Sequence, residues 1–157
     1  MAPRGTGASG ISSVTKVKWH KTKLITDDKG LTLGDHGFHI HAMGRQLVFA
    51  YLRQSYRGMK TAGPDYKPHG KTNGGPHYEV RHVGDLGNLV ADAEGNTHFE
   101  LEDHQVMLHG EFSVIGRSCV CHAKIDDLGE GGDEESKKTG NAGARVACGV
   151  IGLSGAF

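Results

Sequence analysis

The sequence predicts a mostly β protein built as a sandwich or a barrel. Glycine accounts for 25 of the 157 residues and proline for only 4, a balance typical of a chain with many turns. In the second half of the chain, short apolar runs recur at regular intervals between turn residues, which is typical of β-sandwiches and β-barrels. At this length the chain most simply forms one domain with a core of its own.

The N-terminal part divides into a tail and a first β segment. Residues 1–13 are small and polar and offer almost nothing to bury, so we expect a disordered tail and a single domain over residues 14–157. Residues 14–26 predict strand structure, because Val17, Trp19 and Ile25 fall on one face at a period of two. The tail contains no apolar signal core, and we therefore expect a cytoplasmic protein.

The most informative strand follows: it runs through residues 36–41, ends near residue 44, and contains His39, Ile40 and His41. Residues two apart on a strand point to the same face, so the two imidazoles project together and Ile40 turns the other way into apolar packing. Such a pair suits copper or zinc. The alternative is two ordinary histidines on a half-buried strand, but the total of 11 histidines favours a metal.

The rest of the chain alternates loops and short strands. Residues 61–78 and 126–144 are rich in glycine and polar residues and are expected to be long loops, which in compact domains usually serve a function. Residues 45–60 surround an apolar run with basic side chains and predict either a short helix or a strand. The remaining strands are expected at residues 89–91, 98–101, 105–108, 113–123 and 145–151.

Charge and composition argue against two kinds of partner. Lysine plus arginine equals aspartate plus glutamate at 18 each, so the chain lacks the basic footprint of a nucleic-acid binder. No apolar run approaches the length of a transmembrane helix, and no membrane partner is expected. The 3 cysteines, an odd number, do not form a disulfide framework.

Three blocks of the sequence resemble the copper/zinc superoxide dismutase family. They are residues 34–41 (GDHGFHIH), residues 81–88 (RHVGDLGN) and the C-terminal part with IGR at 115–117, DDLG at 126–129, TGNAG at 139–143 and RVACGVIG at 145–152. The resemblance implies an all-β, eight-stranded Greek-key barrel or flattened sandwich, and usually a homodimer. The family places about three strands before residue 30, whereas residues 14–26 supply one long strand or two short ones, so the N-terminal edge is expected to be incomplete.

The resemblance implies a copper site and an anion guide. Three of the family's four copper-binding histidines match His39, His41 and His122. The fourth, which bridges copper and zinc, matches Asp65, whose carboxylate oxygen suits Cu(II). Arg145 matches the arginine that holds the superoxide anion beside copper. The charged loop that guides the anion matches Glu134, Glu135, Lys138 and Thr139.

The resemblance also implies a zinc site, which is damaged in this chain. His82 and Asp85 match two of its ligands and Asp65 a third, but Asn73 stands where the family has a histidine. Because structural zinc is usually held by four ligands, we expect zinc binding to be weak or absent. Two histidines of the first long loop are the alternative replacements for the missing ligand: His69 and His77.

Two further positions follow from the resemblance. Asp126 matches the carboxylate that links the copper and zinc ligand sets, and we expect it to meet His39 and to accept a hydrogen bond from Asn73. Cys148 matches one half of the family's disulfide, but Met59 occupies the partner position, so no disulfide is expected.

These matches predict a copper-dependent oxidoreductase that disproportionates superoxide to oxygen and hydrogen peroxide. Activity is expected to be reduced, because a carboxylate with a pKa near ~4 is a poor proton donor at neutral pH and Asp65 replaces an imidazole. The alternatives are a weak or inactive copper-binding homologue and a copper-chaperone domain. The expected partners are superoxide, a second copy of the chain and a copper chaperone.

Overall fold

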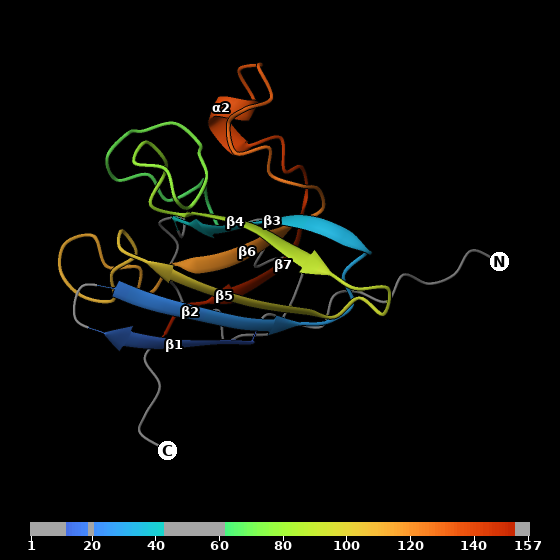
Figure 1. Cartoon of the computed structure of the whole chain (residues 1–157). Helices are drawn as coiled ribbons and strands as arrows, with labels where there is room; N and C mark the ends of the chain where they lie inside the picture. Colours follow the sequence, from blue (N-terminus) through green and yellow to red (C-terminus); the bar gives the residue numbers. More distant parts are fainter. Residues whose placement is uncertain (1–11, 19–20, 43–61, 153–157) are drawn as a thin grey trace.

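The computed structural model describes residues 12–18, 21–42 and 62–152, and it confirms the all-β prediction. Among these residues are seven strands and one short helix (Figure 1). The strands are β1 (Ser12–Lys18), β2 (Lys21–Asp28), β3 (Gly34–His41), β4 (Asp85–Ala91), β5 (Thr97–Asp103), β6 (Ser118–His122) and β7 (Arg145–Val150); the helix is α2 (Ser136–Thr139).

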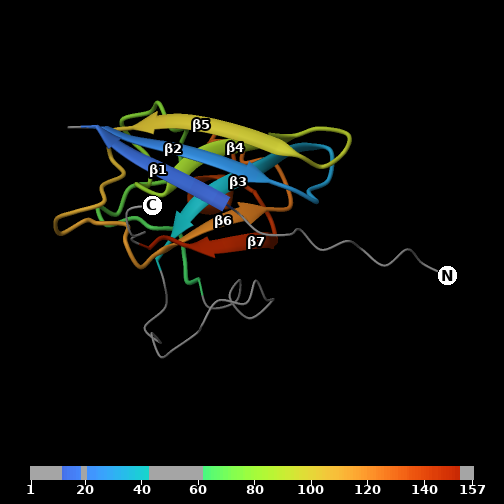
Figure 2. The same ribbon diagram turned by 90° about the horizontal axis from the view of Figure 1, so that it is seen from below.

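The strands form two antiparallel sheets that pack as layers. One sheet has the order β1-β2-β5 and the other the order β4-β3-β6-β7. Figure 2, seen from below, places the first sheet in front of the second. The chain passes between the sheets from β4 to β5 through a turn in which the Asp92 carboxylate accepts hydrogen bonds from the backbone N–H groups of Glu94 (3.0 Å) and Asn96 (2.7 Å). This Asx-type turn satisfies backbone donors that neither sheet reaches.

The N-terminal β segment is a hairpin of two strands rather than one long strand. Its register runs from Ser12 opposite Asp27 to Lys18 opposite Lys21. Strand β1 therefore begins two residues inside the predicted tail, and the division into tail and domain stays a prediction. The shared face predicted for residues 17, 19 and 25 and the element predicted at residues 45–60 lie outside the described side chains and residues.

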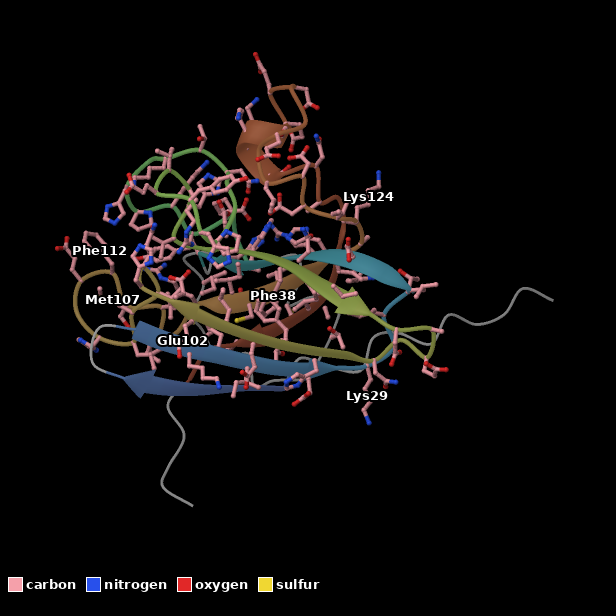
Figure 3. The ribbon with its side chains drawn as sticks, viewed as in Figure 1. Lys29, Phe38, Glu102, Met107, Phe112 and Lys124 are labelled. Atoms are coloured by element: carbon pink, nitrogen blue, oxygen red, sulfur yellow. The ribbon has the colours of Figure 1, made fainter. Side chains whose placement is uncertain are left out.

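The core lies between the sheets and fixes which face of β3 is free for chemistry. Phe38 and Ile40 are almost completely buried in it, as alternation along the strand predicts. Phe38 meets Phe99 of β5 edge to face, with ring centroids 5.7 Å apart, and Figure 3 shows Phe38 between the two layers. From β6, Cys119 and Cys121 contribute to the same core. All three cysteines of the chain are free.

Two predicted strands differ most from the observed ones. Residues 105–108 form no strand, because the Asp103 carboxylate accepts hydrogen bonds from the backbone N–H groups of Gln105 (2.7 Å) and Val106 (2.8 Å) and turns the chain. The strand predicted at 113–123 is shortened to β6, since Gly116 has a φ of 81°, outside the extended region. No helix within the described ranges is both long and apolar enough to cross a membrane.

One buried ion pair holds the segment that leads into β4 to the core. The Arg81 guanidinium, 1% exposed, donates hydrogen bonds to the carbonyl oxygens of His82, Val83 and Asp85 and forms an ion pair with the Asp103 carboxylate at the end of β5. A buried charge needs such a partner set. The segment that leads into β4 is therefore held to the opposite sheet.

Candidate metal centre

Three histidines share the outer face of the four-stranded sheet. His39 and His41 lie on β3, and His122 ends the neighbouring strand β6. The register pairs His39 with Val120 and His41 with Ser118. Paired and alternate residues lie on the same side of a sheet, so all three imidazoles project away from the core. Figure 1 shows that this side is covered by α2 and by the loops before β4 and β7.

The first long loop adds a carboxylate to the three rings. Its backbone joins the edge of β3: Asp65 forms an antiparallel bridge with His41, and the N–H of Tyr66 donates to the Ile40 carbonyl at 2.8 Å. The Asp65 Oδ1 atom consequently lies 2.9 Å from His41 Nε2 and 3.7 Å from His39 Nδ1. The Nε2 atoms of His41 and His122 are 3.2 Å apart. One potential ligand atom from each of the four side chains lies within 4.8 Å of the others.

In each ring, the nitrogen that points away from the centre of the group already has a hydrogen-bond partner. The nitrogen that points toward the centre is left for a metal. His41 Nδ1 donates to the Gly63 carbonyl (2.8 Å), His122 Nδ1 donates to the Gly143 carbonyl (3.0 Å), and His39 Nε2 pairs with the Asp126 carboxylate (2.8 Å). Such partners fix ring orientation and tautomer in metal sites.

The inner atoms fit a copper ion. His39 Nδ1 is buried without a hydrogen-bond partner. In neutral His41 and His122 the Nδ1 atoms carry the protons, so two Nε2 lone pairs face each other across 3.2 Å. A cation between them removes that repulsion, and three imidazole nitrogens with one carboxylate oxygen suit copper.

The buried charges shift the ring pKa values in opposite directions. Burial lowers the pKa of His39, but its hydrogen bond with Asp126 and its attraction to the nearby Asp65 carboxylate outweigh that effect and raise it to about 10. Burial, helped by the nearby His39, lowers the pKa of His122 to about 4. Burial opposes ionisation of Asp65, yet its contacts with His39 and His41 lower its pKa well below the ordinary range. The group thus favours a positive charge at its centre, and in the metal-free protein a proton on His39 supplies that charge.

A cavity of about 540 Å³ opens onto the group, with His41, Asp65 and His122 in its lining. Positively charged side chains outnumber negative ones there. Its cationic lining residues are Lys67, Lys124, Lys138 and Arg145, and its acidic ones are Asp65 and Glu135. An excess of positive charge in a cavity raises the local concentration of small anions.

Arg145 is held at a defined place in this cavity. It begins β7 opposite His122, and its guanidinium donates to the Gly63 carbonyl, the same oxygen that accepts from His41 Nδ1. The predicted loop residues Glu135, Lys138 and Thr139 also line the cavity. Glu134 is instead exposed and pairs with Lys138 at 3.2 Å.

Sequence reasoning missed two cations of the cavity, Lys67 and Lys124. Both are exposed loop lysines without a distinguishing pattern, and Lys124 lies on the loop side of the four-stranded sheet in Figure 3. His36 is buried and structural: its Nδ1 bonds the His122 carbonyl at 2.7 Å and its Nε2 bonds the Thr32 carbonyl at 2.8 Å.

The residues expected at the zinc site are arranged differently from the copper group. His82 Nδ1 lies 3.0 Å from Asp85 Oδ1, and both residues are buried. Asp65 belongs to the other cluster, and within the described parts of the chain that cluster is the one group of three or more His, Cys, Asp or Glu that brings its ligand atoms together. His69 packs edge to face on Phe112 and is exposed. His77 is also exposed.

The fold and the site together define a class: a β-sandwich metalloprotein with a histidine-rich centre at the base of a cationic cavity. The family model described as copper/zinc superoxide dismutase matches residues 8–151. The chain belongs to this family, whose members are oxidoreductases that bind copper and zinc.

One curated relative is named for the same kind of enzyme. It is the extracellular superoxide dismutase [Cu-Zn] of Brugia pahangi, 49% identical over 138 residues that cover 86% of this chain and 65% of the relative. The chain thus spans just under two thirds of that relative's length. The relative's name corrects the prediction of a cytoplasmic location, because a short polar N-terminus does not determine where a protein resides.

Proposed function

We propose that the protein is a copper-dependent superoxide dismutase, which converts two superoxide anions and two protons into one O₂ and one H₂O₂. The observation that carries this proposal is the convergence of His39, His41, His122 and Asp65 at the base of a cationic cavity. When bound there, copper supplies a one-electron redox couple that takes an electron from one superoxide and gives it to the next.

The protein's own residues attract and orient the anion. Lys67, Lys124 and Lys138 raise the local concentration of a small anion by charge. Arg145 offers a guanidinium beside the histidines, and its bond to the Gly63 carbonyl fixes its position before substrate arrives. Asp126 orients the His39 ring by accepting from Nε2, so that Nδ1 faces the centre.

The reduced activity expected from Asp65 stays a prediction. A carboxylate in place of an imidazole carries no N–H for the reaction, so protons come from water through the open cavity. The inactive copper-binding homologue and the copper-chaperone domain remain the other outcomes of the test below.

The experiment measures superoxide loss after the protein is loaded with copper and freed of unbound metal. We expect a rate well above that of the metal-free protein, and Arg145→Ile to lower kcat/KM by at least about tenfold, because charge at the cavity governs anion capture. Arg145→Lys should retain part of the rate. Lys29→Met, an exposed position outside the cavity lining (Figure 3), is the matched charge control. A copper-loaded protein no faster than the metal-free one contradicts the proposal.

Assembly and location are part of the same proposal. We infer a homodimer that receives copper from a chaperone, as the family resemblance implies. The name of the Brugia pahangi relative supports an extracellular location for this chain too. Light scattering of the copper-loaded protein and its recovery from culture medium or cells test the two inferences separately.

A further inference from the structure

The second metal position of the family is occupied here by hydrogen bonds among protein groups. Asp85 Oδ2 accepts from the backbone N–H groups of His82 and Gly74, both at 2.9 Å. Asp85 Oδ1 lies 3.0 Å from His82 Nδ1. When His82 Nδ1 carries the ring proton, the carboxylate therefore accepts three hydrogen bonds from its own loop, and His82 Nε2 is buried without a hydrogen-bond partner.

Asn73 takes the place of an imidazole but uses its amide in another way. Its Nδ2 donates to Asp126 Oδ1 at 2.9 Å, while Asp126 Oδ2 binds His39. An amide N–H cannot bind a cation, so only the neutral Oδ1 of Asn73 is left as a donor atom. Asn73 therefore supports the copper group through Asp126.

Asp65 is committed to the copper group. Its Oδ1 lies 2.9 Å from His41 Nε2, and its ligand atom falls within 4.8 Å of those of all three copper histidines. An imidazole binds a metal on each of two opposite nitrogens. In Asp65, the oxygen that is placed to bind a metal, Oδ1, faces the copper group.

The described ranges of the chain supply no further ligand for a zinc ion. In the described ranges no third His, Cys, Asp or Glu joins His82 and Asp85 in a ligand group. The residues outside those ranges, 1–11, 19–20, 43–61 and 153–157, contain a single residue of these four types, His20. A structural zinc ion usually requires four ligands in a closed tetrahedron, and this donor set does not meet that requirement.

We propose that the chain is a one-metal member of its family, which binds copper and has replaced the zinc site with the hydrogen bonds of Asn73, Asp126, His82 and Asp85. The inference concerns the metal centre of the proposed function and rests on that function only for the choice of copper. In place of a zinc ligand, Asn73 helps to orient the copper group, because it holds Asp126 in its hydrogen bond with His39.

The test is the metal content of the full chain. Protein is refolded or expressed with copper and zinc both supplied in excess, stripped of loosely bound metal, and analysed by elemental mass spectrometry. We expect one copper and less than about 0.1 zinc per chain. Copper-loaded protein titrated with zinc in a calorimeter should show no tight binding. A zinc content of about 0.5 per chain or more, in protein already filled with copper, overturns the inference.

A gain-of-site variant provides the second measurement. Asp65→His combined with Asn73→His restores both imidazoles, and we expect it to bind one zinc in addition to copper. Asp35→His combined with Asn96→His makes the same two replacements at exposed positions and should gain none. If the double variant does not fold, the metal content of the unmodified chain still decides the question.

Failure of this inference is distinguishable from failure of the proposed function. A protein that holds copper without zinc and does not consume superoxide keeps the one-metal inference and loses the dismutase proposal. A protein that consumes superoxide and holds one zinc beside copper does the reverse.

Discussion

Gly84 is the point where the metal-site loop meets strand β3, and Gly84→Ala is the sharpest test of how the site is built. A Cβ at this position would lie 2.2 Å from the Ile40 carbonyl oxygen, where ordinary contact begins at 3.4 Å. The clash is with backbone, so no side-chain rotation relieves it. The Ile40 carbonyl lies between His39 and His41, which means that the substitution acts directly on the spacing of the site.

The expected loss of stability follows from the hydrogen bonds at this point. Three backbone bonds converge here: Ile40 N–H to the Gly84 carbonyl (2.8 Å), Tyr66 N–H to the Ile40 carbonyl (2.8 Å) and Gly84 N–H to the Tyr66 carbonyl (3.0 Å). At a net value of about 1 kcal/mol each, their disruption lowers the free energy of unfolding by about 3 kcal/mol. A small domain has about 5–15 kcal/mol in total, so the variant should still fold.

The assay is urea unfolding of the metal-free protein, paired with a competition titration for copper. We expect the midpoint to fall with an unchanged slope, and copper affinity to fall at least about tenfold, which corresponds to 1.4 kcal/mol, because the loop carries Asp65. Gly152→Ala is the control, since nothing lies within 4 Å of its added Cβ. A Gly84→Ala protein as stable as the Gly152→Ala protein, with the same copper affinity, would refute the reasoning.

Two further outcomes concern pH and the buried ion pair. The raised pKa of His39, about 10, means that the folded metal-free protein keeps a proton that the unfolded chain releases above 6.5, so stability falls as pH rises through that window. The lowered pKa of His122, about 4, makes stability fall as pH drops from 6.5 toward 4. The melting temperature of the metal-free protein should therefore peak near pH 6.5. A melting temperature that continues to rise up to pH 9 would contradict this. Asp103→Asn leaves the buried Arg81 guanidinium without its counter-ion and should cost about 3–5 kcal/mol in urea unfolding. The exposed control Glu94→Gln should change stability by less than about 0.5 kcal/mol, and equal losses in the two variants would exclude the ion-pair explanation.

Local pattern was enough to predict the β class and the face of strand β3. Alternation places Ile40 in the core and both imidazoles of β3 on the other side, because the side-chain period of a strand is two. The same alternation separates Cys119 and Cys121 from His122 on β6. The hydrogen bonds of Asp126 with His39 and Asn73, expected from the family resemblance, are also present.

The ends of the strands were predicted less well, for a local reason that alternation does not record. The Asp103 carboxylate captures the backbone N–H groups that a strand at residues 105–108 would have used. Gly116, with its positive φ, delays the start of β6 until Ser118. Both effects depend on a single side chain or a single torsion angle.

The sequence by itself determined which chemical groups were available: imidazoles at alternate strand positions, a carboxylate where a bridging imidazole stands in the family, and an amide in place of another. Only the tertiary structure decided which of them meet. Asp65 and His41 are far apart along the chain, and the backbone bridge between them turns the carboxylate toward the three rings. Lys67 and Lys124 are ordinary surface lysines until the loops bring them around one cavity. Strand periodicity is a local property, whereas the packing of loops on a sheet depends on contacts between distant residues, which a linear pattern does not contain.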